Sequence, residues 1–171
     1  NLRVVRLFAQ TLETISKGEL KQSFSAFNSE QTFDQYLQRI SGKTASLFAM
    51  AAESGAVLSK APEESVQILK RYGFNLGIAF QIIDDVLDFV GVEEEMGKPV
   101  GSDLVQGTIT LPSLMLLELY PKDNPVKRQF QNEGNKQENI TEAIELVVNS
   151  GIVDKCYRIA LDYCTRARQG F

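Results

Sequence analysis

The sequence predicts an all-α protein, and three observations support this. Apolar residues recur at helical spacing, as Val4, Phe8, Leu12 and Ile15 do near the beginning of the chain. No segment shows the alternation of apolar and polar residues that is typical of a strand. At 171 residues, the chain is long enough for a single domain with a buried core. We therefore expect residues 1–171 to form one helical domain.

Breaks in the apolar pattern set the expected bounds of the first helices. The first helix should run to about Lys17 and end at Gly18, because a lysine in the last turn and a glycine after it favour a helix end. A second helix is expected over about 30–40, where apolar residues again share one face, and Ser41–Gly42 should break it. A third, over 43–59, is rich in alanine and should allow a neighbouring helix to approach closely.

A long helix should follow, beginning beside Pro62 and running to about Val90, where Gly91 ends it. Residues 93–103 hold two glycines and a proline, and they are expected to form a loop. The remaining periodic segments predict four more helices, over 108–119, shortly after Pro125, over 136–149 and over 153–168.

Composition excludes several classes of function. The net charge of −4 and the lack of a basic run argue against a nucleic-acid surface. There is no histidine, so the commonest acid–base residue and zinc ligand is missing. Cys156 and Cys164 are expected to be reduced thiols, which indicates a cytoplasmic location. Aspartates interrupt the longest apolar run, so we expect no transmembrane segment.

The long helix carries an unusual polar stripe. Gln81, Asp84, Asp85 and Asp88 fall within about 100° of its circumference, and nearly all other positions around them are apolar. Carboxylates on such a helix must be paired, protonated or bound to a cation. Clustered carboxylates suit Mg²⁺, which keeps positions open for phosphate oxygens and water. A stripe that simply faces solvent is the alternative interpretation.

Two lysines flank this stripe in the sequence. Lys43 and Thr44 follow the expected break, where the N–H groups at the beginning of a helix would favour an anion. Lys98 lies in the glycine-bounded loop, ten residues after Asp88, and it could fold back over the carboxylates. Acids for Mg²⁺ and lysines for phosphate oxygens together indicate a diphosphate site.

Several motifs in this order resemble those of the trans-isoprenyl diphosphate synthases. The segment from Phe80 to Asp88 is similar to the second aspartate-rich motif of that family, FQxxDDxxD. Residues 18–22 are similar to the GELxQ signature of its polyprenyl, long-chain branch. Three further segments resemble the motifs GKTAxLF, GKxxGxDL and GxxTLPxL, and they lie at 42–48, 97–104 and 107–114.

The resemblance implies a helical bundle of the isoprenoid synthase type with a central active-site cavity, and a homodimer. It implies condensation of isopentenyl diphosphate with an allylic diphosphate to give polyprenyl, geranylgeranyl or farnesyl diphosphate. Carried over by motif, the metal ligands are Asp84, Asp85 and Asp88, with Asp84 and Asp88 nearest Mg²⁺. Lys43 and Lys98 would bind the leaving diphosphate, and Thr44 and Gln81 would lie along the allylic carbons.

The family's first aspartate-rich motif and its isopentenyl diphosphate segments are not found in these 171 residues. We therefore expect the chain to be an interior or C-terminal piece of a larger synthase domain, and the piece alone to be inactive. Three alternatives remain open. They are a non-catalytic partner subunit of a heteromeric prenyl synthase, a terpene cyclase, and a helical interaction module whose acidic stripe pairs with a basic partner.

Overall fold

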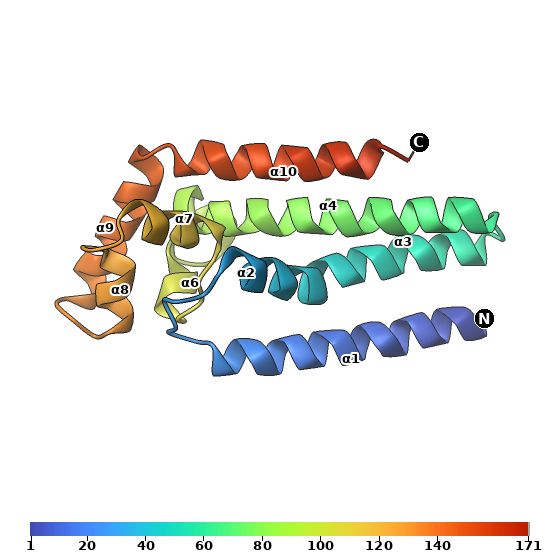
Figure 1. Ribbon diagram of the computed structural model, residues 1–171, viewed down its shortest axis with the longest axis horizontal. Coiled ribbons are helices and arrows are strands. Elements are labelled where there is room, and N and C mark those ends of the chain that lie inside the picture. Colours follow the sequence, from blue (N-terminus) through green and yellow to red (C-terminus); the bar gives the residue numbers. More distant parts are fainter. Residues whose placement is uncertain (171) are drawn as a thin grey trace. The chain divides into compact units, whose positions relative to one another are not determined.

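The structure of the protein, a computed structural model, describes residues 1–170, without the side chain of Lys21. These residues form helices and no strand, which confirms the predicted fold class. In chain order the elements of Figure 1 are α1 (Leu2–Phe24), α2 (Phe33–Ile40), the π-helix η1 (Ser41–Ala45), α3 (Ser46–Leu58), α4 (Glu63–Val90), α5 (Glu93–Met96), α6 (Ser102–Val105), α7 (Leu111–Leu119), α8 (Pro125–Phe130), α9 (Lys136–Asn149) and α10 (Ile152–Arg168).

Two expected helix ends are wrong. Helix α1 passes through Gly18 and continues to Phe24, because one glycine inside a helix costs only about 1 kcal/mol. The chain also stays helical through Ser41 and Gly42, where η1 joins α2 directly to α3. The loop expected over 93–103 contains the short helices α5 and α6.

The described chain separates into two compact units. The first contains residues 1–21, 37–81 and those from 159 onward, and the second contains 22–36 and 82–158. Helix α4 contributes to both units. That residues 1–171 form a single domain stays a prediction, and its last residue, Phe171, lies outside the described residues.

The first unit is built on close packing of α4 against η1 and α3. A β-carbon added at Gly77 would lie 2.6 Å from the α-carbon of Ala45, and one added at Gly73 would lie 2.4 Å from the carbonyl oxygen of Phe48. The alanine-rich segment therefore does receive a neighbouring helix at close range, as its small residues predict. Figure 1 shows α1 running alongside α3 and α4 in the same unit.

In the second unit, α7, α8 and α9 pack against one another beside the last turns of α4. Asn124 links two of these helices, because its side-chain amide donates to the Leu116 carbonyl oxygen while its side-chain oxygen accepts from the Val126 N–H. Both cysteines are free thiols, as predicted. Burial raises the pKa of Cys156 to about 12, so this thiol stays protonated. No described helix is long and apolar enough to cross a bilayer.

Candidate active site

Asp88 lies at the centre of a cluster in the second unit and is 1% exposed. The Ser102 hydroxyl donates to its Oδ1 at 2.7 Å, and the backbone N–H of Asp103 donates to its Oδ2 at 3.1 Å. The Nζ of Lys98 lies 3.0 Å from Oδ1. One hydroxyl, one amide and one ammonium group therefore satisfy this buried carboxylate, and all three come from the segment that follows α4.

The loop reaches Asp88 because Gly101 takes a left-handed conformation. Its φ is 77°, and its N–H donates to the backbone carbonyl oxygen of Asp88 at 2.7 Å. A β-carbon at Gly101 would lie 2.9 Å from a methyl group of Ile140 in α9, so both conformation and space favour glycine. The glycine-bounded segment thus folds back over the end of α4, which is where the sequence predicts Lys98 to lie.

Opposing influences act on the Lys98 ammonium group. Burial lowers its pKa, but the hydrogen bond and charge of Asp88, with the charges of Asp103 and Asp84, outweigh this and raise the pKa above its ordinary value. Its side chain remains 36% exposed. Lys98 is therefore a fixed positive charge that is anchored on Asp88 and still accessible to a ligand.

Asp85 and Asp84 differ in their surroundings. Asp85 is 3% exposed, and the hydroxyl of Tyr36, itself fully buried, donates to its Oδ2 at 2.8 Å. Asp84 is the most exposed of the three aspartates. Mg²⁺ commonly takes one or two protein carboxylates and fills its other positions with water and phosphate oxygens, so a stripe with one partly exposed carboxylate fits this ion. Among the described residues, no group of three or more acidic, cysteine or histidine side chains is arranged so that it could hold a metal ion.

The other predicted site residues form a second group, in the first unit. The Thr44 hydroxyl donates to Oε1 of Gln81 at 2.6 Å, joining η1 to α4. Lys43, on the same π-helix, pairs with Glu19 of α1 at 2.7 Å and is 46% exposed. The expected helix N-terminus at Lys43 is wrong, because helical backbone precedes it without a break. Single π turns within α-helices occur frequently at functional sites. The π turn, rather than a helix N-terminus, is therefore the local feature that indicates a functional role for Lys43.

Tyr36 and Ser102 donate hydrogen bonds to two of the candidate aspartates, although the sequence did not predict this. A buried tyrosine hydroxyl usually has a hydrogen-bond partner. The apolar helical face that carries Tyr36 therefore gave a weak indication that this hydroxyl bonds to a polar group. Ser102 lies within the GKxxGxDL-like segment, but nothing in the sequence shows that its hydroxyl reaches back fourteen residues to Asp88.

Known proteins resemble this chain in sequence and in fold. The family described as "Polyprenyl synthetase" matches residues 1–147. A prenyl transferase of Synechocystis sp. is 38% identical over 170 residues, which cover 99% of this chain and 51% of that protein.

Two solved structures are similar over nearly the whole chain. The heptaprenyl diphosphate synthase of Staphylococcus aureus superposes with a TM-score of 0.89 at 37% identity, covering 98% of this chain and 52% of the other. A polyprenyl synthase of Caulobacter crescentus, complexed with calcium and isoprenyl diphosphate, gives 0.92 at 31% identity and covers 99% and 52%. The chain thus spans about half the length of these proteins. By sequence and by fold, it belongs to the polyprenyl synthetase family.

Proposed function

We propose that this chain provides one diphosphate-binding half of a Mg²⁺-dependent prenyltransferase that condenses isopentenyl diphosphate with an allylic diphosphate. The observation that carries the proposal is the cluster at the end of α4, where Lys98 is anchored on buried Asp88 while Asp84 on the same helix is more exposed. A partly exposed carboxylate and a fixed ammonium group together suit a metal-bound diphosphate.

The chemistry follows from where these charges lie. In the reaction, the bond between the allylic carbon and the diphosphate oxygen breaks, and both electrons stay with the oxygen. Lys98, and Lys43 in the other group, would stabilise the negative charge that develops on the departing diphosphate. The Thr44–Gln81 pair would present oxygen atoms to the allylic cation.

The double bond of isopentenyl diphosphate then supplies the electrons for the new carbon–carbon bond. A proton is lost from the adjacent carbon, and the released diphosphate can accept it, which suits a chain without histidine. Asp84 and Asp88, together with Asp85, would hold Mg²⁺ on the diphosphate, and the ion would add positive charge on the leaving group.

Incorporation of labelled isopentenyl diphosphate tests this proposal, in the protein as its gene encodes it, with any residues that flank these 171. We expect Mg²⁺-dependent product, and we expect Asp84→Ala to lower turnover by orders of magnitude with helix content unchanged. Glu94→Ala, at an exposed carboxylate of α5, is the matched control and should retain activity. Near-normal turnover of Asp84→Ala at saturating Mg²⁺ would overturn the metal assignment.

Residues 1–171 alone should not elongate a prenyl chain, because they hold only one aspartate-rich cluster. A polypeptide of verified mass that extends a labelled allylic diphosphate would contradict this expectation. We further propose that the working protein is a cytoplasmic homodimer. Sedimentation of the active protein, with subcellular fractionation, tests these two points.

A further inference from the structure

Residues 25–32 connect α1 to α2, and hydrogen bonds from their own side chains shape this connection, which we call the α1–α2 loop. The side-chain amide of Gln31 donates to the Ser25 carbonyl oxygen at 3.1 Å. The Thr32 hydroxyl accepts from the Gln35 N–H, while the Gln35 side chain accepts from the Thr32 N–H, which is a capping box at the beginning of α2. The α1–α2 loop is therefore compact and internally bonded.

Phe27 has an unfavourable backbone conformation within this loop. Its φ is 60°, in the left-handed region that glycine and asparagine take readily and that a bulky side chain rarely adopts. Phe27 is 50% exposed, so burial of its ring offsets this cost only in part. Strained conformations persist where the surroundings hold them, and they are frequent at functional sites. Stability of the loop is therefore a weak reason for a phenylalanine at this position.

Two contacts hold Phe27 against Gly107, in the segment that follows α6. The Phe27 N–H donates to the Gly107 carbonyl oxygen at 2.8 Å. Gly107 has a φ of 77°, and a β-carbon there would lie 2.6 to 2.7 Å from three atoms of the Phe27 ring. The same ring meets Phe130 of α8 in edge-to-face geometry, with centroids 5.4 Å apart. The ring thus fills the space that a side chain at position 107 would need, and glycine suits both the conformation and the contact.

The Gly107 contact continues to the carboxylate that anchors Lys98. The Thr108 N–H, next in the chain, donates to the Asp103 carbonyl oxygen at 2.8 Å, and the Asp103 N–H donates to Oδ2 of Asp88 at 3.1 Å. Lys98 meets the other oxygen of the same carboxylate at 3.0 Å. All of these residues belong to the second unit, in which Figure 1 shows the α1–α2 loop passing beside α6. The loop is therefore connected to the ammonium group through the backbone around α6 and through the carboxylate.

The end of the α1–α2 loop is fixed on the aspartate stripe. Tyr36 follows the capping box in α2, and its backbone N–H donates to the Thr32 carbonyl oxygen at 3.0 Å. Its buried hydroxyl donates to Asp85, three residues before Asp88 on α4. Because the end of the loop is held here, Phe27 is a fixed support rather than a side chain that moves with its neighbour.

We propose that Phe27 is a positioning residue for the diphosphate site. By holding Gly107, it fixes the segment that follows α4 and, with it, the place of Lys98. This inference rests on the proposed function, because the place of Lys98 matters to the reaction only if its ammonium group binds the diphosphate. In this role Phe27 touches neither metal nor substrate, and it acts through the loop backbone and Asp88.

The first test compares two ligands with the same hydrocarbon chain, farnesyl diphosphate with Mg²⁺ and farnesol. In the protein as its gene encodes it, Phe27→Ala should weaken farnesyl diphosphate binding by about tenfold, the effect of losing one hydrogen bond to a charged group. Farnesol binding, which needs no ammonium group, should not change. Phe24→Ala, the same substitution at a phenylalanine that is 90% exposed, is the matched control and should leave both affinities as in wild type. An equal loss for both ligands would mean a general structural role and would overturn the inference, as would no loss at all.

A double-mutant cycle shows whether Phe27 acts through Lys98. Lys98→Ala alone should weaken farnesyl diphosphate binding, and adding Phe27→Ala to it should cause little further loss. Additive losses would mean that Phe27 acts independently, and they would overturn the inference. If Phe27→Ala does not fold, Phe27→Asn replaces it in both experiments. Asparagine tolerates the left-handed conformation and keeps the N–H donor, so we expect a smaller loss in the same direction.

Amide hydrogen exchange without ligand or metal gives a measurement that does not depend on the proposed function. The amides of residues 101–108 should exchange faster in Phe27→Ala than in wild type, and at the wild-type rate in Phe24→Ala. Equal exchange in Phe27→Ala and wild type would refute the inference, even if the protein binds farnesyl diphosphate. Equal binding of farnesyl diphosphate by wild type and Lys98→Ala would instead refute the role of Lys98 in the proposed function, and only the hold of Phe27 on the loop would remain.

Discussion

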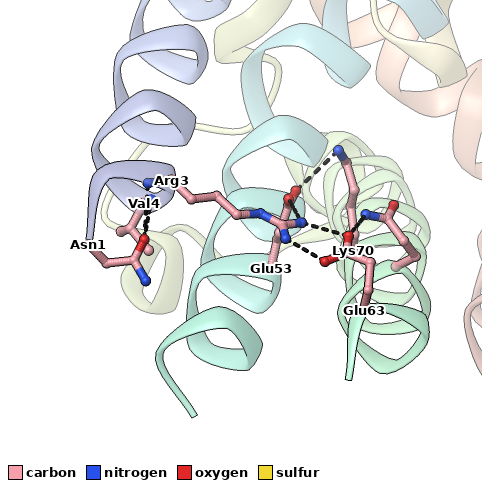
Figure 2. A network of polar contacts seen from close by, with 7 residues as sticks. Asn1, Arg3, Val4, Glu53, Glu63 and Lys70 are labelled. Carbon is pink, nitrogen blue, oxygen red and sulfur yellow. Dashed lines mark hydrogen bonds and ion pairs between the residues drawn. The ribbon is translucent and has the colours of Figure 1, made fainter. Parts of the chain in front are cut away.

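Two buried carboxylates, one in each unit, are held in different ways. Asp88 receives a hydroxyl, a backbone N–H and an ammonium group, all from residues that follow it by fifteen positions or fewer. Among the described residues, Glu53 pairs with two cations, Arg3 and Lys70, from two other helices (Figure 2). The Asp88 cluster therefore forms between residues close in sequence and fixes the position of Lys98. The Glu53 network instead depends on the tertiary packing of three helices.

Removing the Asp88 carboxylate should cause the largest loss. Asp88→Ala leaves the Ser102 hydroxyl and the Asp103 N–H without their acceptor, so we expect the free energy of unfolding to fall by about 3 kcal/mol. Turnover should fall by orders of magnitude, because Lys98 loses its anchor. Urea denaturation and steady-state kinetics measure these effects. A loss under 1 kcal/mol would show that the loop does not depend on Asp88.

Tyr36→Phe should have an intermediate effect. It deletes one hydroxyl and leaves buried Asp85 without that donor, which should lower the free energy of unfolding by about 1 to 3 kcal/mol. Urea denaturation of Tyr36→Phe beside wild type gives the value. Phe33→Leu is the control, since it changes a ring that packs on Tyr36 without touching the hydroxyl. Equal stability of Tyr36→Phe and wild type would show that other groups satisfy Asp85.

Glu53→Ala should cost less than Asp88→Ala. Its partners Arg3 and Lys70 are 38% and 46% exposed, so both cations can turn to water when the carboxylate is lost. We expect the free energy of unfolding to fall by about 1 kcal/mol. The same urea experiment decides this, and a loss as large as that of Asp88→Ala would mean that the two carboxylates are equivalent.

The smallest expected effects are changes in stability with pH, and they should fall in different pH ranges for the two regions. Hydrogen bonds from Arg3 and then Gln67 lower the pKa of Glu63 from 4.5 to about 2, so the stability from this pair is present above pH 4.5 and is lost as pH falls towards 2. The raised pKa of Lys98 acts in the opposite range. Its contribution is complete below its ordinary pKa of 10.5 and is lost as pH rises through the higher folded value.

Thermal melting of variants across pH tests this difference. Glu63→Gln should flatten the acid side of the stability profile and leave the alkaline side as in wild type. Lys98→Met should flatten the alkaline side alone. If each variant changed both sides equally, the two pairs would not be independent.

Local patterns in the sequence predicted much of the fold. The expected helix over 136–149 matches α9, and the long helix ends at Val90, as Gly91 predicts. The errors at Gly18 and at Ser41–Gly42 have one cause. Glycine and serine only weaken a helix, so packing along the rest of the helix decides whether it continues.

The candidate site was predictable where it rests on spacing along one helix or one loop. The aspartate stripe and the position of Lys98 in the loop after it are features of that kind. The bond from Tyr36 to Asp85 spans 49 residues, and the ion pair of Arg3 with Glu53 spans 50. Such contacts depend on which helices pack together in the tertiary structure. No local pattern distinguishes Glu53 in an alanine-rich helix from an ordinary solvated glutamate.

The π turn at 41–45 has a consequence for the phase of the helix that contains it. Eight residues separate Tyr36 from Thr44, which on an ideal α-helix would point their side chains about 80° apart. By absorbing one extra residue, the π turn reduces this angle to about 20°, and both hydroxyls reach α4, at Asp85 and at Gln81. If the same residues formed a regular α-helix instead, the angle would return to about 80°, and only one of the two hydroxyls could point correctly. One further residue inserted between Tyr36 and Thr44 would rotate one hydroxyl away from the other by about 100°, so the length of this stretch is fixed by angle rather than by distance.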